Sequence, residues 1–259
     1  MGKIKIKDIN LLLLILLPLT FIVSPYSHSF MVIVILVWIN NNNLRLRDFL
    51  YLKKVSASIV LLSVLIGTLL ALMNFFDHFY FRFTIETIGK SKMSLSLSNI
   101  WFLFTFCIFK PFIEELFFRG FLYNFYKKKG ILIALIISSV LFSVLHFDLY
   151  RIIIIFIIGV FLVLLYEITE CFWISVLVHG SINAIHTLLV VQPVARYMKV
   201  LLYWMQGDNV LLFRLKLLPV SIVLFILVIL VMILIMSISK NNIFQEKKFK
   251  LVNKNEASH

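Results

Sequence analysis

Long apolar runs separated by short polar or basic segments dominate the chain. Most of these runs approach the roughly 20 residues that an α-helix needs to cross about 30 Å of hydrocarbon. The pattern predicts an all-α, polytopic membrane helix bundle of about eight transmembrane helices, the fourth interrupted at Lys110-Pro111. The predicted spans are residues 9–23, 30–39, 55–76, 99–126, 131–147, 152–166, 171–191 and 217–239.

The composition supports a membrane protein and excludes a typical soluble globular domain. Of the 259 residues, 62% are hydrophobic and only 14% are charged, whereas soluble domains carry about 25% charged residues. The two cysteines, Cys107 and Cys171, lie inside apolar runs. We interpret them as small apolar fillers of helices, because their placement is not typical of a disulfide framework or a Cys-rich metal site.

The lysines and arginines predict the orientation of the bundle. Placing both termini in the cytoplasm assigns 15 of them to cytoplasmic segments and 8 to outer loops, as the positive-inside rule favours. The net charge of +13 therefore indicates contact with the lipid surface and not with nucleic acid. The cytoplasmic segments are residues 1–8, 40–54, 127–130, 167–170 and 240–259.

The two ends of the chain carry separate predictions. Three lysines precede the first apolar run, as in a signal peptide, but Ser24-Pro25-Tyr26 follows it without a small-residue cleavage site. We therefore expect an uncleaved first helix and a single transmembrane domain over residues 1–239. Residues 192–216 are expected to form an outer loop. Residues 240–259 are expected to form a disordered, basic cytoplasmic tail.

Charged residues inside the fourth run are the strongest functional signal. An ionisable side chain at membrane depth is costly, so it marks a functional site by default. Glu115 and Arg119 are separated by four residues and can pair on one helix face. Glu114 points about 100° away from Glu115 and has no evident local partner. The alternative is a structural ion pair at a helix end.

Two further polar motifs lie in the fifth and seventh runs. His146 follows Phe142 by four residues, and Asn183 follows His179 by four, so each pair shares a helix face. His186 lies near the face of Asn183 and extends the polar stripe. Taken alone, these residues could equally serve an interfacial position or hydrogen bonding between helices.

Together the polar residues predict hydrolytic chemistry. A carboxylate and an imidazole can activate water for peptide hydrolysis, while hydrogen-bond donors stabilise the tetrahedral oxyanion. Glu114, His146 and His179 would also provide the ligands of a zinc site. The chain has no H-E-x-x-H sequence, so its spacing requires neither zinc nor another cofactor. A divalent metal such as zinc stays an alternative.

In chain order the motifs read E-E-x-x-x-R, F-x-x-x-H and H-x-x-x-N. This order on successive membrane helices resembles the CPBP family of intramembrane proteases, which comprises CAAX prenyl proteases and bacteriocin-processing or abortive-infection proteins. One motif alone is weakly specific, but all three in order are a strong signal. The resemblance implies a helical core at about residues 99–191 within an eight-helix bundle.

The resemblance also implies a role for each motif residue. Glu114 would be the general base that acts on water together with His146. His179 and Asn183 would form the oxyanion hole. Glu115, counted with the catalytic set, would support the site together with Arg119 and Phe142.

The resulting expectation is an intramembrane endopeptidase in a bacterial plasma membrane, surrounded by lipid and acting on peptides or membrane proteins. Bacteriocin immunity or processing is the expected physiological role. The alternative is a non-enzymatic immunity or scaffold protein whose polar residues serve helix packing. A transporter is disfavoured, because the chain shows no inverted repeat and no pair of broken helices.

One geometric test opposes the convergence of these residues. Straight spans that rise about 1.5 Å per residue place Glu114 and His146 at depths that differ by roughly 14 Å. Convergence therefore follows from the resemblance and not from hydropathy.

Overall fold

The computed structural model describes residues 31–33, 35–36, 39–40, 50–81, 97–146, 148–149, 151–190, 194–206 and 210–256. These residues are predominantly helical, with one isolated β-bridge between Leu52 and Cys171. The predicted all-α class is confirmed. The predicted span at residues 9–23 lies outside the described residues, and the described part of the span at 30–39 is helical.

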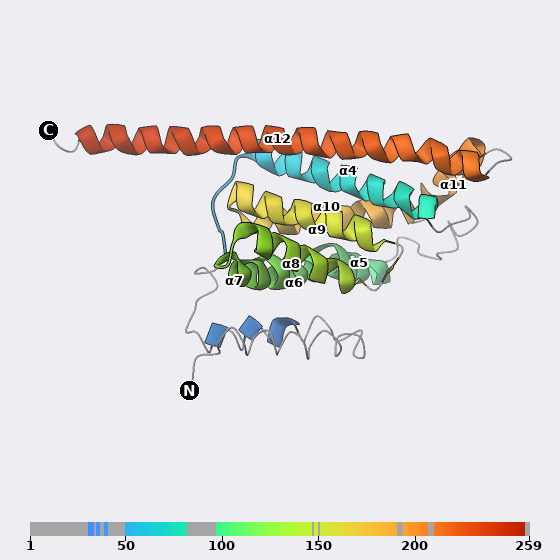
Figure 1. Cartoon of the computed structure of the whole chain (residues 1–259), viewed down its shortest axis with the longest axis horizontal. Helices are drawn as coiled ribbons and strands as arrows, with labels where there is room; N and C mark the ends of the chain where they lie inside the picture. The colour runs from blue at the N-terminus through green and yellow to red at the C-terminus, as the bar shows by residue number, and fades with distance from the viewer. Residues whose placement is uncertain are drawn as a thin grey trace.

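Figure 1 shows the described helices lying side by side in one bundle, in which α12 runs antiparallel to α4 and α9 runs antiparallel to α10. Helix α10 packs against α4 and α9, α12 lies along α4, and α8 packs on α9. Apart from the stretch at residues 97–127, the helices are α4 (Ala57–Phe81), α8 (Ile131–Val144), α9 (Ile152–Thr169), α10 (Phe172–Val190), α11 (Val194–Gln206) and α12 (Val210–Glu256).

Four of the described helices are long and apolar enough to cross a membrane. They correspond to the predicted third, sixth, seventh and eighth spans and cover Ala57–Asp77, Ile152–Thr169, Phe172–Leu189 and Leu215–Asn241. Helix α8 is a shorter apolar helix. A multi-pass membrane protein is therefore confirmed, while the count of eight spans stays a prediction.

Residues 97–127 form one helical stretch that changes its winding four times. Its segments are α5 (Leu97–Phe104), the π-helix η2 (Thr105–Phe109), α6 (Lys110–Glu115), the π-helix η3 (Leu116–Tyr123) and α7 (Asn124–Lys127). Pro111 removes one backbone donor, and the wide turn before it is closed by the Lys110 N–H, which donates to the carbonyl of Thr105. The predicted interruption is therefore a change of helix type within a continuous stretch.

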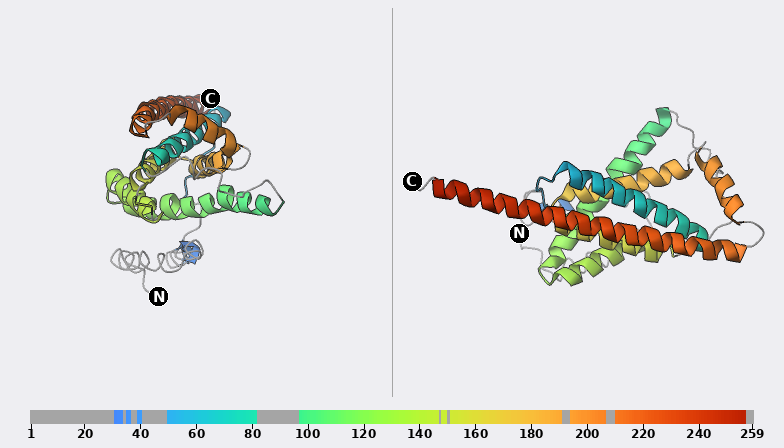
Figure 2. Two further views of the ribbon diagram at one scale, coloured as in Figure 1. Left: turned by 90° about the vertical axis from the view of Figure 1, so that its right-hand side faces the viewer. Right: turned by 90° about the horizontal axis from the view of Figure 1, so that it is seen from above.

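This stretch does not run parallel to its neighbours. Figure 2 shows α5 projecting obliquely out of the bundle, while the other end of the stretch packs against α8. The estimate that separated Glu114 from His146 assumed perpendicular spans. It was wrong because the helix crosses the bundle at an angle.

Two expectations outside the core were also wrong: the outer loop at residues 192–216 and the disordered tail at residues 240–259. Residues 194–206 form helix α11, and α12 already begins at Val210. Arg196 and Lys199 interrupt the apolar residues of α11 and lower its mean hydropathy. The helix nevertheless buries Leu202. The tail is helical as far as Glu256, since residues 240–256 contain no proline or glycine and many good helix formers.

Candidate active site

Helix α6 places two carboxylates in the interior of the bundle. Glu114 is 5% exposed and Glu115 is fully buried. The two flanking π-helices, η2 and η3, each contain wide turns that rotate the following residues relative to a regular α-helix. Glu114 and Glu115 point about 100° apart within α6, yet both are buried among the packed helices.

Glu115 and Arg119 form the predicted ion pair. Arg119 Nη1 lies 3.0 Å from Glu115 Oε1, and both side chains are fully buried. Arg119 Nη2 donates to the carbonyl oxygen of Gly159 in α9 at 3.1 Å. The guanidinium also lies 4.6 Å from the centre of the Phe142 ring. Arg119 therefore ties the carboxylate to both α8 and α9.

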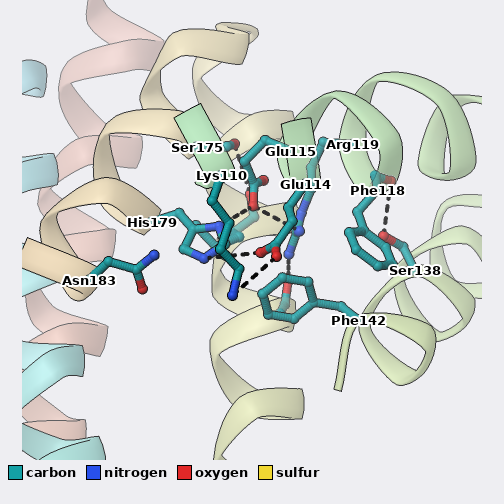
Figure 3. Close-up of polar contacts among 12 residues, drawn as sticks. Lys110, Glu114, Glu115, Phe118, Arg119, Ser138, Phe142, Ser175, His179 and Asn183 are labelled. Atoms are coloured by element: carbon teal, nitrogen blue, oxygen red, sulfur yellow. Dashed lines mark hydrogen bonds and ion pairs between the residues drawn. The ribbon is translucent and has the colours of Figure 1, made fainter. Parts of the chain in front are cut away.

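His179 of α10 contacts both carboxylates, as Figure 3 shows. Its Nδ1 is 2.8 Å from Glu115 Oε1, and its Nε2 is 3.5 Å from Glu114 Oε2. An ionised carboxylate can only accept a hydrogen bond, so Nδ1 carries the proton towards Glu115. Glu115 thereby fixes the orientation of the imidazole, and Nε2 is directed at Glu114.

Glu114 has a local partner that the sequence interpretation missed. Lys110 Nζ lies 3.6 Å from Glu114 Oε1, on the same helix and four residues earlier. The statement that Glu114 has no local partner was therefore wrong. The signal was present in the sequence, since a lysine four residues before a glutamate can reach it. The pair places a cation and an imidazole on either side of the Glu114 carboxylate.

His146 lies just beyond the last turn of α8. Its Nδ1 is 2.7 Å from the carbonyl oxygen of Phe142. Because a carbonyl accepts only, Nδ1 carries the proton of the neutral ring and Nε2 keeps its lone pair. Phe142 packs against both imidazoles, with ring centres 4.7 Å from His146 and 5.5 Å from His179.

A cavity of about 310 Å³ brings the polar residues of several helices together. Lys110, His146, His179 and Asn183 line it, and Glu114 contacts two of these four residues. Asn183 Nδ2 donates to the carbonyl oxygen of Phe106 at 2.9 Å. In Figure 3, Asn183 lies on the side of His179 away from the carboxylates. Four polar or charged residues of the cavity had no assigned role in the sequence interpretation: Asn74, Lys110, Arg151 and His186.

The arrangement does not form a metal site within the part of the chain that the structure describes. No group of three His, Cys, Asp or Glu side chains there could hold an ion. His146 Nδ1 is engaged by Phe142 and His179 Nδ1 by Glu115. These contacts leave Nε2 of each ring as the nitrogen that could bind a metal, so zinc bound by Glu114, His146 and His179 stays an alternative prediction.

Comparisons with known proteins support a protease. Residues 96–185 match the family model described as "Type II CAAX prenyl endopeptidase Rce1-like". A similar curated protein is the "Putative membrane peptidase YdiL" of Bacillus subtilis (strain 168), with 29% identity over 90 residues. The alignment covers 34% of this chain and 37% of that protein. No solved structure matches the chain.

The matched segment contains every residue of the three motifs. It begins at residue 96, one residue before α5, and ends two residues after Asn183. The similarity to this endopeptidase family therefore covers the part of the chain that forms the site.

Proposed function

We propose that the protein is an intramembrane endopeptidase that hydrolyses peptide bonds with water activated by Glu114 and His146. The observation that carries the proposal is the cavity, at which polar groups of three motifs meet inside an apolar bundle. Buried polar groups in lipid are costly, and helix packing alone does not require two carboxylates and two imidazoles around one space.

The proposed reaction begins with a water molecule between Glu114 and the substrate carbonyl. Glu114 takes one proton from this water, and the resulting hydroxide forms a bond with the carbonyl carbon. His146 acts on the same water through the lone pair of Nε2. Transfer of the abstracted proton to the departing nitrogen breaks the C–N bond and releases an amine and a carboxylic acid.

The oxyanion of the tetrahedral intermediate is assigned to His179 and Asn183. Asn183 has a second amide hydrogen besides the one that binds Phe106. Since His179 Nδ1 already faces Glu115, donation from Nε2 requires the doubly protonated ring. Glu115 and the oxyanion would then balance its charge, because Glu114 has taken a proton from the water.

The substrates are proposed to be peptides, leader segments or membrane proteins that enter from the bilayer, with bacteriocin immunity or processing as the physiological setting. The test is cleavage of a quenched peptide library by the full-length protein in detergent. Wild type is compared with the isosteric variant Glu114→Gln and with His146→Ala. Glu170→Gln is the matched control, because its side chain is 52% exposed and contacts Lys53.

We expect Glu114→Gln to lower kcat/KM by about 10²- to 10⁴-fold, the usual contribution of a general base. His146→Ala should cause a comparable loss, and Glu170→Gln should cleave as wild type does. Full biological activity of the two site variants in cells would instead support the non-enzymatic immunity or scaffold protein.

Metal dependence is tested in the same assay with a chelator. We expect cleavage to change by less than about twofold, because the chain has no H-E-x-x-H spacing and the proposed step needs only Glu114 and His146 to activate water. Loss of cleavage that added zinc restores would contradict this expectation and would support a metal bound by Glu114, His146 and His179.

A further inference from the structure

The cavity extends beyond the segment that matches the family. Two of its polar lining residues lie outside residues 96–185: Asn74 of α4 and His186 of α10. The proposed hydrolytic steps give them no role. Their polarity in apolar helices needs a separate explanation.

Asn74 is the more unusual of the two. It is 7% exposed, its neighbours Met73 and Phe75 are buried apolar residues, and its Oδ1 has no hydrogen-bond partner among the described residues. Buried side-chain oxygens in native proteins are nearly always paired. Because Asn74 also lines the cavity, a bound ligand could supply the missing donor.

His186 has a similar character. Its side chain is more than half-buried and lines the same cavity. A neutral imidazole offers one donor and one acceptor. Asn74 and His186 together present uncharged hydrogen-bonding groups from two helices that pack against each other.

The charges around the cavity favour a neutral ligand. Both cationic lining residues already have anionic partners, Lys110 with Glu114 at 3.6 Å and Arg151 with Asp148 at 2.8 Å. The remaining lining includes Ile155, Ile158 and Ile182. Hydrogen-bonding groups set among isoleucines match a peptide backbone that carries apolar side chains.

We propose that Asn74 and His186 form a subsite that binds the backbone of an extended, uncharged and apolar peptide segment next to the scissile bond. The side-chain amide of Asn74 is chemically the same group as a peptide bond, so its oxygen accepts from a substrate N–H. This inference rests on the proposed endopeptidase activity and adds how its substrate is held.

Asn74→Leu removes the amide while keeping a similar side-chain size. Loss of one hydrogen bond should raise KM about fivefold to tenfold with kcat changed less than about twofold, because the amide does not touch the reacting atoms. Asn74→Ala should likewise raise KM and leave kcat nearly unchanged. This second variant shows whether the effect of leucine comes from disturbed packing. Ser63→Ala is the matched control, since that buried hydroxyl of α4 bonds Ile59 and does not line the cavity.

Direct contact is tested with ester analogues of the library peptide that wild type cleaves fastest. Each analogue replaces one peptide N–H by oxygen. Wild type should cleave the analogue that lacks the N–H bound by Asn74 with a kcat/KM about fivefold to tenfold lower than that of the parent peptide. Asn74→Leu should cleave this analogue and the parent peptide equally well. His186→Phe should lower sensitivity at a neighbouring position.

Two results would distinguish failure of the subsite proposal from failure of the proposed endopeptidase activity. If Glu114→Gln is inactive but Asn74→Leu and Asn74→Ala keep the wild-type KM and every ester penalty, the subsite is overturned and the endopeptidase stands. If Glu114→Gln cleaves as wild type does, the proposed hydrolytic function itself is overturned.

Discussion

At the scale of single residues, the site depends on a buried arginine. Arg119 is fully buried and would be prohibitively costly in an apolar bundle without partners. Glu115 neutralises its charge, the Gly159 carbonyl accepts a second hydrogen bond, and Phe142 covers the planar guanidinium. These contacts also hold Glu115 in place for His179. The arginine therefore acts on the chemistry through the residues that it positions.

Arg119→Lys tests whether the forked geometry is needed. A lysine keeps the charge but cannot reach Glu115 and Gly159 with two fixed groups. We expect about tenfold lower kcat/KM and a lower apparent Tm in detergent, corresponding to about 1–3 kcal/mol for the lost buried hydrogen bond. Arg196→Lys, on an exposed position of α11, serves as control. A variant as active and as stable as wild type would show that charge alone suffices.

At the scale of helices, close packing between α10 and the oblique stretch sets the geometry of the site. A Cβ atom built on Gly180 would lie 2.5 Å from the carbonyl oxygen of Cys107 in η2. Glycine thus permits the two backbones to approach, as small residues do at membrane helix interfaces. Gly180 directly follows His179, so this contact controls how close the imidazole comes to Glu115.

Gly180→Ala should separate the two helices, because the obstructing atom belongs to the backbone and cannot rotate away. We expect a stability loss of about 1–3 kcal/mol, typical of overpacking, and at least about tenfold lower cleavage. Thermal unfolding and peptide cleavage in detergent measure both effects. The comparison is Leu188→Ala, a half-exposed position on the same helix. Normal cleavage by Gly180→Ala would mean that the contact does not govern the site.

At the scale of the whole molecule, the connections separate into two ends. The α7–α8 turn, the α9–α10 turn and the C-terminal end of α12 lie at one end of the bundle (Figure 1). These are segments assigned to the cytoplasm from their position and basic residues. The α8–α9 connection, which contains Leu149, lies at the other end. These positions agree with the predicted alternation of cytoplasmic segments and outer loops along the chain. Which end of the bundle faces the cytoplasm is still a prediction.

The orientation can be measured with a membrane-impermeant maleimide on intact bacterial cells. Leu149→Cys is suitable because Leu149 is 83% exposed. We expect labelling of this cysteine from outside and none of Lys128→Cys in the α7–α8 turn. Cys107 and Cys171 are partly and fully buried and provide the background. The opposite labelling pattern would reverse the assigned topology.

The sequence by itself determined the helices and the candidate residues. Hydropathy and helix length are local properties, so the runs at 55–76, 152–166, 171–191 and 217–239 correspond to observed helices. The Glu115–Arg119 pair also follows from spacing within one helix. The same local measure failed for α11 and for the tail, because polar helices give no hydropathy signal.

Only the tertiary structure decided how the motifs meet. The tilt of the 97–127 stretch, its two π-helices and the contact at Gly180 arise from packing against helices distant in sequence. For the same reason no local pattern could place Asn74 at the cavity or His179 between two carboxylates. The sequence specified which polar groups enter the membrane, and the packing of helices at unequal angles determined which of them share one cavity.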